Sequence, residues 1–193
     1  MPHNRIHNQR LAQRLRRDLL LAHQTDTLPG VAALPERPKA LLRLQIFKQR
    51  TAPFLLLINS DLATRVRVRG WIAWRSLQVR RWISSAWPGE STLLLRASLL
   101  APQASVQHGR IALRMVADRP TAQLLTRCGG AIYSSSLNRH GGVATTPTRS
   151  QQWRWHRFCW GNFCWISTAT TQPASGKASA LIDLHGRRAI RLR

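Results

Sequence analysis

The 193-residue sequence is poor in acidic side chains, in lysine, in cysteine and in long apolar runs. Only 7 residues are Asp or Glu, against 30 Lys and Arg, so the formal net charge is +23. So few carboxylates disfavour catalysis by paired carboxylates, and Asp26 is the only acid inside a motif-like segment. The composition instead favours cations and hydroxyl groups that position phosphates and carboxylates electrostatically.

Other absences bear on the compartment and on the class of protein. The longest apolar blocks, 19–22 and 54–58, are far shorter than the roughly 20 residues that a membrane-spanning helix needs. The first residues lack the apolar core of a secretory signal. The 3 cysteines, an odd number, favour a reducing compartment. We therefore expect a cytoplasmic protein.

Common nucleotide-binding loops and metal sites are also missing from the sequence. There is no P-loop and no glycine-rich dinucleotide turn after a strand. Cys159 and Cys164, with His156 nearby, have the spacing of part of a zinc site, but a second pair of ligands is missing. We therefore expect no metal ion held by the protein itself.

Arginine is what the chain has in excess, because only Lys39, Lys48 and Lys177 among its basic residues are lysines. The excess favours contact with a polyanion, RNA or DNA first; the alternative is a general bias towards arginine without any partner. Arginines alternate with tryptophans in two places, 65–87 and 153–165. Such tryptophans stack on nucleobases in some proteins and more often pack in the core, so both readings stay open here.

Helical and strand-like patterns alternate along the chain, which predicts an α/β protein with a mixed sheet in a single domain, 1–193. The predicted helices are 4–18, 35–50, 61–86 with a possible break at Gly70, and 118–128. The predicted strands are 19–22, 54–58, 91–96, 110–116, one that begins at Ala131, and a closing hairpin of 180–184 and 189–192. We expect a loop at 141–152 and a polar linker at 168–177.

The most informative segment is 131–142, which begins as an apolar strand and continues into Ser134-Ser135-Ser136, Asn138 and a pair of glycines. We interpret it as a buried strand that delivers small polar groups to a loop at its carboxyl end, where open α/β sheets bind ligands. The segment Thr25-Asp26-Thr27 repeats this arrangement after 19–22. The alternative is an ordinary Ser/Asn/Gly turn.

Six segments, in order and at similar spacing, resemble motifs of the YrdC-type threonylcarbamoyl-AMP synthases. They are 24–31, 47–50, 87–92, 112–120, 134–141 and the closing strands with Ser179 and Arg191. The chain departs from the family pattern in the loop after Arg50 and at Gln24, Pro29, Glu90, Arg110 and His140. We identify no family counterpart for the Trp-rich stretch 153–165; the range 153–177 is a Trp/Arg-rich insert followed by the polar linker.

The resemblance implies a twisted open mixed sheet with flanking helices and a central, positively charged cavity. It implies an L-threonylcarbamoyladenylate synthase, a nucleotidyltransferase that condenses L-threonine, bicarbonate and ATP into threonylcarbamoyl-AMP and diphosphate. The product feeds the N6-threonylcarbamoyladenosine modification of tRNA, t6A37. ATP is then a substrate that brings Mg²⁺, and the implied partners are tRNA and a downstream threonylcarbamoyl transferase complex. The alternative is a non-catalytic, diverged RNA-binding relative of the same fold.

The resemblance also implies residue roles. The residues matching the family's catalytic and ATP-binding positions are Lys48, Arg50, Ser136 and Asn138, with Arg191 added for ATP. The residues matching its threonine-binding positions are Thr27, Arg114, Ser134 and Ser179, with Arg114 pairing with the threonine carboxylate and Ser179 also near the nucleotide. These roles require side chains that are far apart in the sequence to meet in one hollow.

Overall fold

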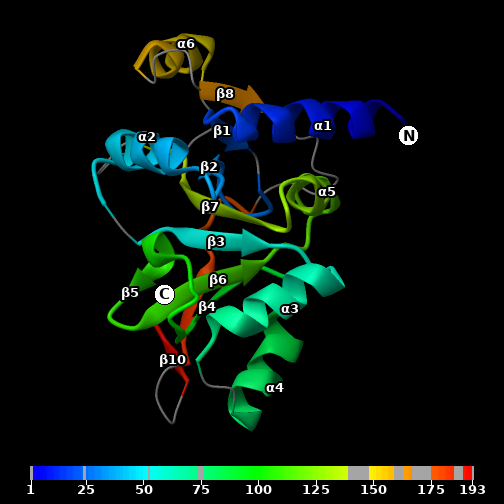
Figure 1. Cartoon of the computed structure of the whole chain (residues 1–193), viewed down its shortest axis with the longest axis vertical. Coiled ribbons are helices and arrows are strands. Elements are labelled where there is room, and N and C mark those ends of the chain that lie inside the picture. The colour runs from blue at the N-terminus through cyan, green and yellow to red at the C-terminus, as the bar shows by residue number, and fades with distance from the viewer. Residues whose placement is uncertain are drawn as a thin grey trace.

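Figure 1 shows the computed structural model, which describes residues 2–23, 25–51, 53–73, 76–138, 148–158, 163–166, 175–184 and 189–192. The helices are α1 (Pro2–Arg16), α2 (Pro38–Lys48), α3 (Leu62–Trp71), α4 (Leu77–Ala86), the short η1 (Gln103–Ser105), α5 (Arg119–Arg127) and α6 (Arg149–Phe158). The strands are β1 (Leu20–His23), β2 (Gly30–Ala33), β3 (Leu55–Ile58), β4 (Ser91–Arg96), β5 (Val106–Gln107), β6 (Arg110–Met115), β7 (Ala131–Ser136), β8 (Phe163–Ile166), β9 (Ala180–Asp183) and β10 (Ile190–Arg191). Within these ranges no helix is both long and apolar enough to cross a membrane.

All ten of these strands belong to one twisted, open sheet. Its order is β10-β9-β4-β6-β3-β7-β2-β1-β8, and β5 pairs with β6 beside this path. The pairs β3–β6, β4–β9 and β1–β8 are parallel, and the other pairs are antiparallel. The predicted mixed α/β sheet is therefore confirmed, and so is the closing hairpin, because β9 and β10 pair.

Four local differences from the sequence prediction have physical reasons. Strand β2 begins at the glycine of a Pro-Gly pair that predicts a turn, and hydrogen bonding to both β1 and β7 stabilises the strand there. The helix predicted over 61–86 breaks after Trp71 and not at Gly70, because Ile72 is extended and bridges to Ala97. Helix α6 begins inside the predicted loop 141–152, where Thr148 and Gln151 each accept the other's backbone N–H. The three serines of 134–136 lie within β7 itself and not in a loop after it.

The two faces of the sheet are covered differently. One face packs its apolar residues, such as Leu56 and Leu93, against Phe47 of α2, Val68 of α3 and Val79 of α4. On the other face, helices α1 and α5 pack on β1, β2, β3 and β7 through the apolar residues Leu11, Leu15, Leu21, Ala32, Leu57, Leu124, Leu125 and Ile132. Strands β4, β6 and β9 contribute no residue to this second cluster. The second face is therefore free to open as a cavity over these three strands.

The turn after α5 gives a first test of this architecture. Gly130 has φ +91° and donates its N–H to the carbonyl of Leu125, and a Cβ placed there would overlap the Thr64 hydroxyl of α3. Gly130→Ala is expected to lower the free energy of unfolding by about 3 kcal/mol, because left-handed strain and overpacking add. Urea denaturation measures the change.

Gly109 provides the control for that measurement. Its φ is +70°, but a Cβ there meets no atom within 4 Å. Gly109→Ala should therefore cost only the backbone strain, about 1–2 kcal/mol. Equal losses for the two variants would mean that α3 does not press on the Gly130 turn.

Candidate active site

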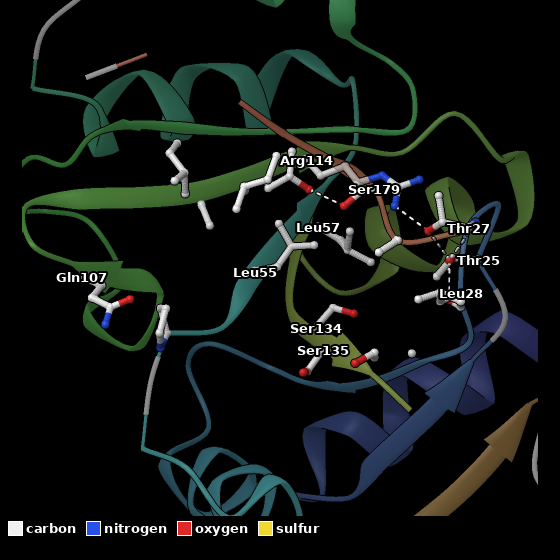
Figure 2. Close-up of a pocket in the computed structure, with 18 of the residues that line it drawn as sticks. Thr25, Thr27, Leu28, Leu55, Leu57, Gln107, Arg114, Ser134, Ser135 and Ser179 are labelled. Atoms are coloured by element: carbon white, nitrogen blue, oxygen red, sulfur yellow. Dashed lines mark hydrogen bonds between the residues drawn. The ribbon is translucent and has the colours of Figure 1, made fainter. Parts of the chain in front are cut away.

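A cavity of about 400 Å³ opens on the face of the sheet that α1 and α5 leave uncovered. This volume lies in the range of small-molecule sites. Much of its wall consists of alternate residues of five strands, because side chains of a strand return to the same face every second residue. The strand residues of the lining include Leu55 and Leu57 of β3, Thr92 and Leu94 of β4, Ala112 and Arg114 of β6, Ser134 and Ser136 of β7, and Leu181 of β9. Figure 2 shows the cavity and labels Leu55, Leu57, Arg114 and Ser134 among them.

Arg50 borders the cavity from the loop that follows α2. Its Nη2 donates to the Ser135 hydroxyl at 3.1 Å, and its guanidinium carbon lies 5.1 Å from the centre of the Phe54 ring. Partial burial lowers the pKa of Arg50, yet an arginine stays charged at neutral pH. The structure therefore holds one permanent cation against the serines of β7.

Lys48 lies behind these serines and is only 5% exposed. Its Nζ donates to the carbonyls of Ser136 and Asn138 at 2.8 and 2.6 Å, and to Asn138 Oδ1 at 2.7 Å. Ser136 Oγ donates to the same Oδ1 at 2.7 Å. Burial, and then the charge of Arg50, lowers the pKa of Lys48 from 10.5 to about 8. The structure thus brings Lys48, Ser136 and Asn138 into one cluster, of which Ser136 lines the cavity.

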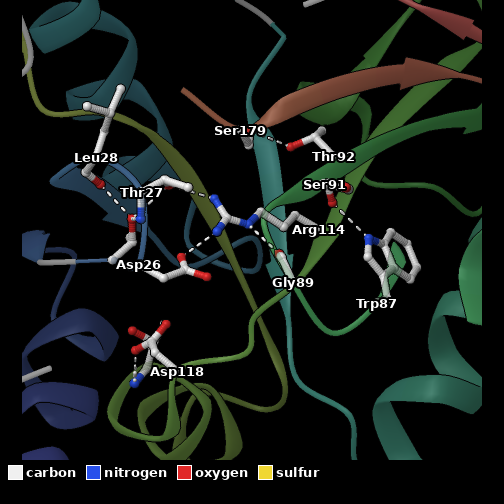
Figure 3. A network of polar contacts seen from close by, with 12 residues as sticks. Asp26, Thr27, Leu28, Trp87, Gly89, Ser91, Thr92, Arg114, Asp118 and Ser179 are labelled. Carbon is white, nitrogen blue, oxygen red and sulfur yellow. Dashed lines mark hydrogen bonds and ion pairs between the residues drawn. The ribbon is translucent and has the colours of Figure 1, made fainter. Parts of the chain in front are cut away.

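Arg114 forms the opposite wall and is 3% exposed. Figure 3 shows its guanidinium held by three partners: Nε donates to the Gly89 carbonyl at 3.0 Å, Nη1 donates to Thr27 Oγ1 at 2.7 Å, and Nη2 pairs with the Asp26 carboxylate. Thr25 and Thr27 share a further hydroxyl hydrogen bond of 3.1 Å. The Arg114 guanidinium therefore joins the motif 24–31 to the strand 110–116, and the Asp26 carboxylate is its ion-pair partner.

The remaining predicted residues are placed as follows. Ser134 and Ser179 line the cavity, and the Ser179 hydroxyl shares a 2.8 Å hydrogen bond with Thr92. Arg191 is different, because its position in β10 is opposite Ile182, a residue of the core on the other face of the sheet. Arg191 is not among the residues that line the cavity, and the nucleotide contact predicted for it stays a prediction.

Five of the seven acidic residues pair with an arginine or cap a helix. Asp18, Asp26 and Asp183 pair with Arg37, Arg114 and Arg110, and Asp61 and Asp118 cap the N-termini of α3 and α5. Among the residues that the structure describes, no group of three or more His, Cys, Asp or Glu could hold a metal ion. Some predictions fall outside the described residues. They concern Gln24, Trp74, His140, Cys159, the first part of the predicted loop (141–147) and most of the linker (168–174).

Four polar residues of the lining were not among the predicted site residues, namely Thr25, Thr92, Gln107 and Ser135. Thr92 had a signal, because it directly precedes the apolar residues 93–95 of a strand whose alternate positions face one side. At position 29 the backbone carbonyl accepts the N–H of Leu137 at 2.7 Å, which ties the 24–31 turn to the end of β7; any residue could make this contact, so it does not explain the proline. The departure at Arg110 pairs with Asp183 at 3.0 Å.

Comparison with known proteins decides the family. The model of the Sua5/YciO/YrdC family, described as "Telomere recombination", matches residues 13–193. This chain belongs to the Sua5/YciO/YrdC family. The match includes the Trp/Arg-rich segment and confirms the resemblance found in the sequence.

Relatives of this Sua5/YciO/YrdC protein carry a consistent name. A Chromobacterium violaceum protein named threonylcarbamoyl-AMP synthase is 30% identical over 196 residues, which cover 98% of this chain and 97% of the relative. A Chromohalobacter salexigens protein of the same name is 36% identical over 130 residues, covering 66% of this chain and 68% of the relative.

Solved structures share the fold of this Sua5/YciO/YrdC protein. P. abyssi Sua5, solved in complex with L-threonine, has a TM-score of 0.79 and 24% identity; the match covers 98% of this chain and 54% of Sua5, so this chain spans about half of that protein. E. coli YciO has a TM-score of 0.74 and 16% identity, with 98% and 89% of the two chains covered.

Proposed function

We propose that this protein is an L-threonylcarbamoyladenylate synthase, which condenses L-threonine, bicarbonate and ATP into threonylcarbamoyl-AMP and diphosphate. The observation that carries the proposal is the cavity, where Arg50 and Ser136 stand on one wall and Thr27, Arg114 and Ser179 on another. The name shared by the relatives that match over two thirds or nearly all of their length supports the same activity. The product would serve the t6A37 modification of tRNA.

The reaction requires an anionic nucleophile to meet an anionic triphosphate. In the second half of the reaction, a carbamate oxygen of carboxylated threonine attacks the α-phosphorus of ATP, a new P–O bond forms and the bond to diphosphate breaks. Negative charge gathers on the departing diphosphate, so preorganised cations and hydroxyl donors in a small cavity lower the barrier. Arg50 is the residue best placed for this, because it borders the cavity, keeps its charge and can hold phosphate with two N–H groups.

Lys48 has a supporting role in this proposal. Its ammonium contacts three protein acceptors, so it fixes the backbone and side chain of the Ser136–Asn138 segment and adds positive charge behind it. Ser136, at the end of β7, then lies where its hydroxyl group can contact the nucleotide. The predicted nucleotide set becomes Lys48, Arg50, Ser136 and Asn138, with direct cationic contact assigned to Arg50.

The threonine end of the proposed site is the Arg114 wall. Arg114 is already neutralised by Asp26, and its Nη1 holds Thr27, so both guanidinium and hydroxyl are locked in position before substrate enters. Threonine carries a carboxylate, a hydroxyl and the carbamate, which suit a wall of guanidinium N–H and the hydroxyl groups of Thr27, Ser134 and Ser179. We propose these four residues as the threonine-binding set.

Magnesium would enter with ATP as part of the substrate. Phosphate oxygens and water supply most ligands of Mg²⁺ in such complexes, so a cavity lined by hydroxyls and guanidinium groups fits a metal-bound nucleotide. The contacts with tRNA and with a downstream transferase, the cytoplasmic location and the organisation of 1–193 as one domain remain predictions. The single sheet, which runs from β1 to β10, supports the last of these.

An exchange of labelled diphosphate into ATP tests the proposed activity. We expect exchange to require both L-threonine and bicarbonate, and Arg50→Ala to reduce its rate by at least about 100-fold, the effect of removing one charged donor from a transition state. Arg80→Ala is the control, because Arg80 is exposed on α4 and lines no part of the cavity. Exchange that ignores threonine, or equal effects of the two variants, would contradict the proposal.

A further inference from the structure

Helix α6 presents two tryptophans in opposite directions. Trp155 packs inward on Phe47 of α2, with ring centres 5.4 Å apart and planes at 90°. Trp153 lies two residues earlier, about 200° around the helix, and is 60% exposed. Figure 1 shows α6 at one end of the molecule, next to β8 and α2. The inner tryptophan thus anchors the helix, whereas packing within the fold does not account for the outer one.

The surroundings of Trp153 are cationic. Arg149, Trp153 and Arg157 follow one another every four residues, so they form a row on one side of α6 that rises about 12 Å. The guanidinium of Arg157 lies 4.9 Å from the centre of the Trp153 ring, and Arg154 and His156 are exposed beside the row. The sequence has no acidic residue between Asp118 and Asp183. We call Arg149, Trp153, Arg154 and Arg157 the α6 face.

We propose that the α6 face binds single-stranded nucleic acid, with an unpaired base stacked on Trp153 and phosphates paired with Arg149 and Arg154. An exposed indole offers a flat apolar surface that every base can stack on, and arginines on either side of it match the charge of a phosphate chain. A duplex hides its base faces, so it gains only the phosphate contacts. No residue of the α6 face lines the cavity, so this surface is additional to the proposed catalytic site and does not depend on it.

The first test measures binding of a fluorescent single-stranded RNA of about 12 nucleotides, a length in the range that such surfaces cover. Trp153→Ala should weaken binding by about tenfold, the loss of one stacked base. The variant Arg149→Ala/Arg154→Ala should lower the slope of log affinity against log salt by about 0.7 for each arginine removed. The same RNA annealed to its complement should bind more weakly than the single strand and should not respond to Trp153→Ala.

Arg80→Ala/Arg81→Ala is the control pair, because it removes the same charge from exposed positions on another helix, α4. It should leave the affinity within about twofold if binding is localised to α6. Equal losses for the two pairs, or no effect of Trp153→Ala, would overturn the proposal in favour of general attraction by the net charge. Competition by a poly-glutamate peptide that equals competition by unlabelled RNA would also overturn it, because the surface would then suit an acidic protein.

Threonine-dependent exchange, measured on the same samples, keeps this inference separate from the proposed function. Trp153→Ala should retain the wild-type exchange rate, which also shows that the variant is folded. If the wild-type protein shows no exchange but binds the single strand through Trp153, the proposed reaction fails and the nucleic-acid surface stands.

Discussion

Arg114→Ala is expected to lower the free energy of unfolding by about 3 kcal/mol, because it leaves the largely buried Asp26 carboxylate without its partner. The same change removes the donors to Gly89 and Thr27, which belong to two different segments at the cavity. Threonine-dependent exchange should disappear with it. Urea denaturation measures the stability, and exchange is measured at a temperature where the variant remains folded.

The companion variant Arg114→Met/Asp26→Leu separates the two effects. Replacing both charges by apolar side chains of similar size removes the uncompensated carboxylate, so most of the lost stability should return. Activity should not return, because the guanidinium proposed to meet threonine is still missing. If exchange does recover in the double variant, Arg114 is a structural residue and the threonine assignment is wrong.

The Asp18–Arg37 pair serves as a reference for these numbers. Its N–O distance of 2.8 Å is that of a good ion pair, but the Arg37 side chain is 41% exposed. Solvent screens such pairs, so Arg37→Ala should cost no more than about 1 kcal/mol. The contrast between the two arginines would show that burial, and not the mere presence of an ion pair, sets the stability at the cavity wall.

Local sequence patterns predicted the elements but not how they meet. The strand at 91–96 is found with the predicted bounds, and the helix at 118–128 within one residue at each end, because apolar spacing, a capping Asp and nearby turns are local signals. Strand β2 has no such signal, since partners on both of its sides create it. In a segment as short as β2, hydrogen bonding to neighbouring strands therefore determines the secondary structure more than the local sequence does.

The site illustrates the same limit. The resemblance pointed to Lys48, Ser136 and Asn138, but not to the burial of Lys48 behind β7, because a lysine at the last position of a helix normally faces solvent. The partnership of Asp26 and Arg114 joins residues 88 positions apart, and no spacing rule connects them. Arg191 shows how sensitive placement is to register: a shift of one residue in a strand sends a side chain to the other face. Its position opposite Ile182 depends on a register of only two residue pairs between β10 and β9.

The exchange rate is expected to fall as pH rises through about 8, the pKa of Lys48, while the stability of the fold changes in the opposite sense. Above this pKa the amine loses the charge that supports the Ser136–Asn138 segment. The unfolded chain, in which the pKa returns to 10.5, still binds the proton between pH 8 and 10.5, so the folded state gains stability with rising pH in this window. The full gain is about 3 kcal/mol, since each pKa unit corresponds to about 1.4 kcal/mol.

Two variants isolate this behaviour. Lys48→Arg keeps a positive charge between pH 8 and 10.5, so its exchange rate should no longer fall near pH 8. Bicarbonate converts to carbonate at high pH in both samples, so this variant also controls for the loss of that substrate. Lys48→Met has no titrating group, so its unfolding free energy should lack the rise seen in the wild type. Its exchange should be about 100-fold slower than that of the wild type below pH 8, and the difference should shrink as the wild-type amine loses its charge. A wild-type profile that coincides with that of Lys48→Arg would mean that the Lys48 charge is not needed. The segment of Ser136 and Asn138 would then be held by its own hydrogen bonds, and Arg50 would be the one cation of this wall that acts on the nucleotide.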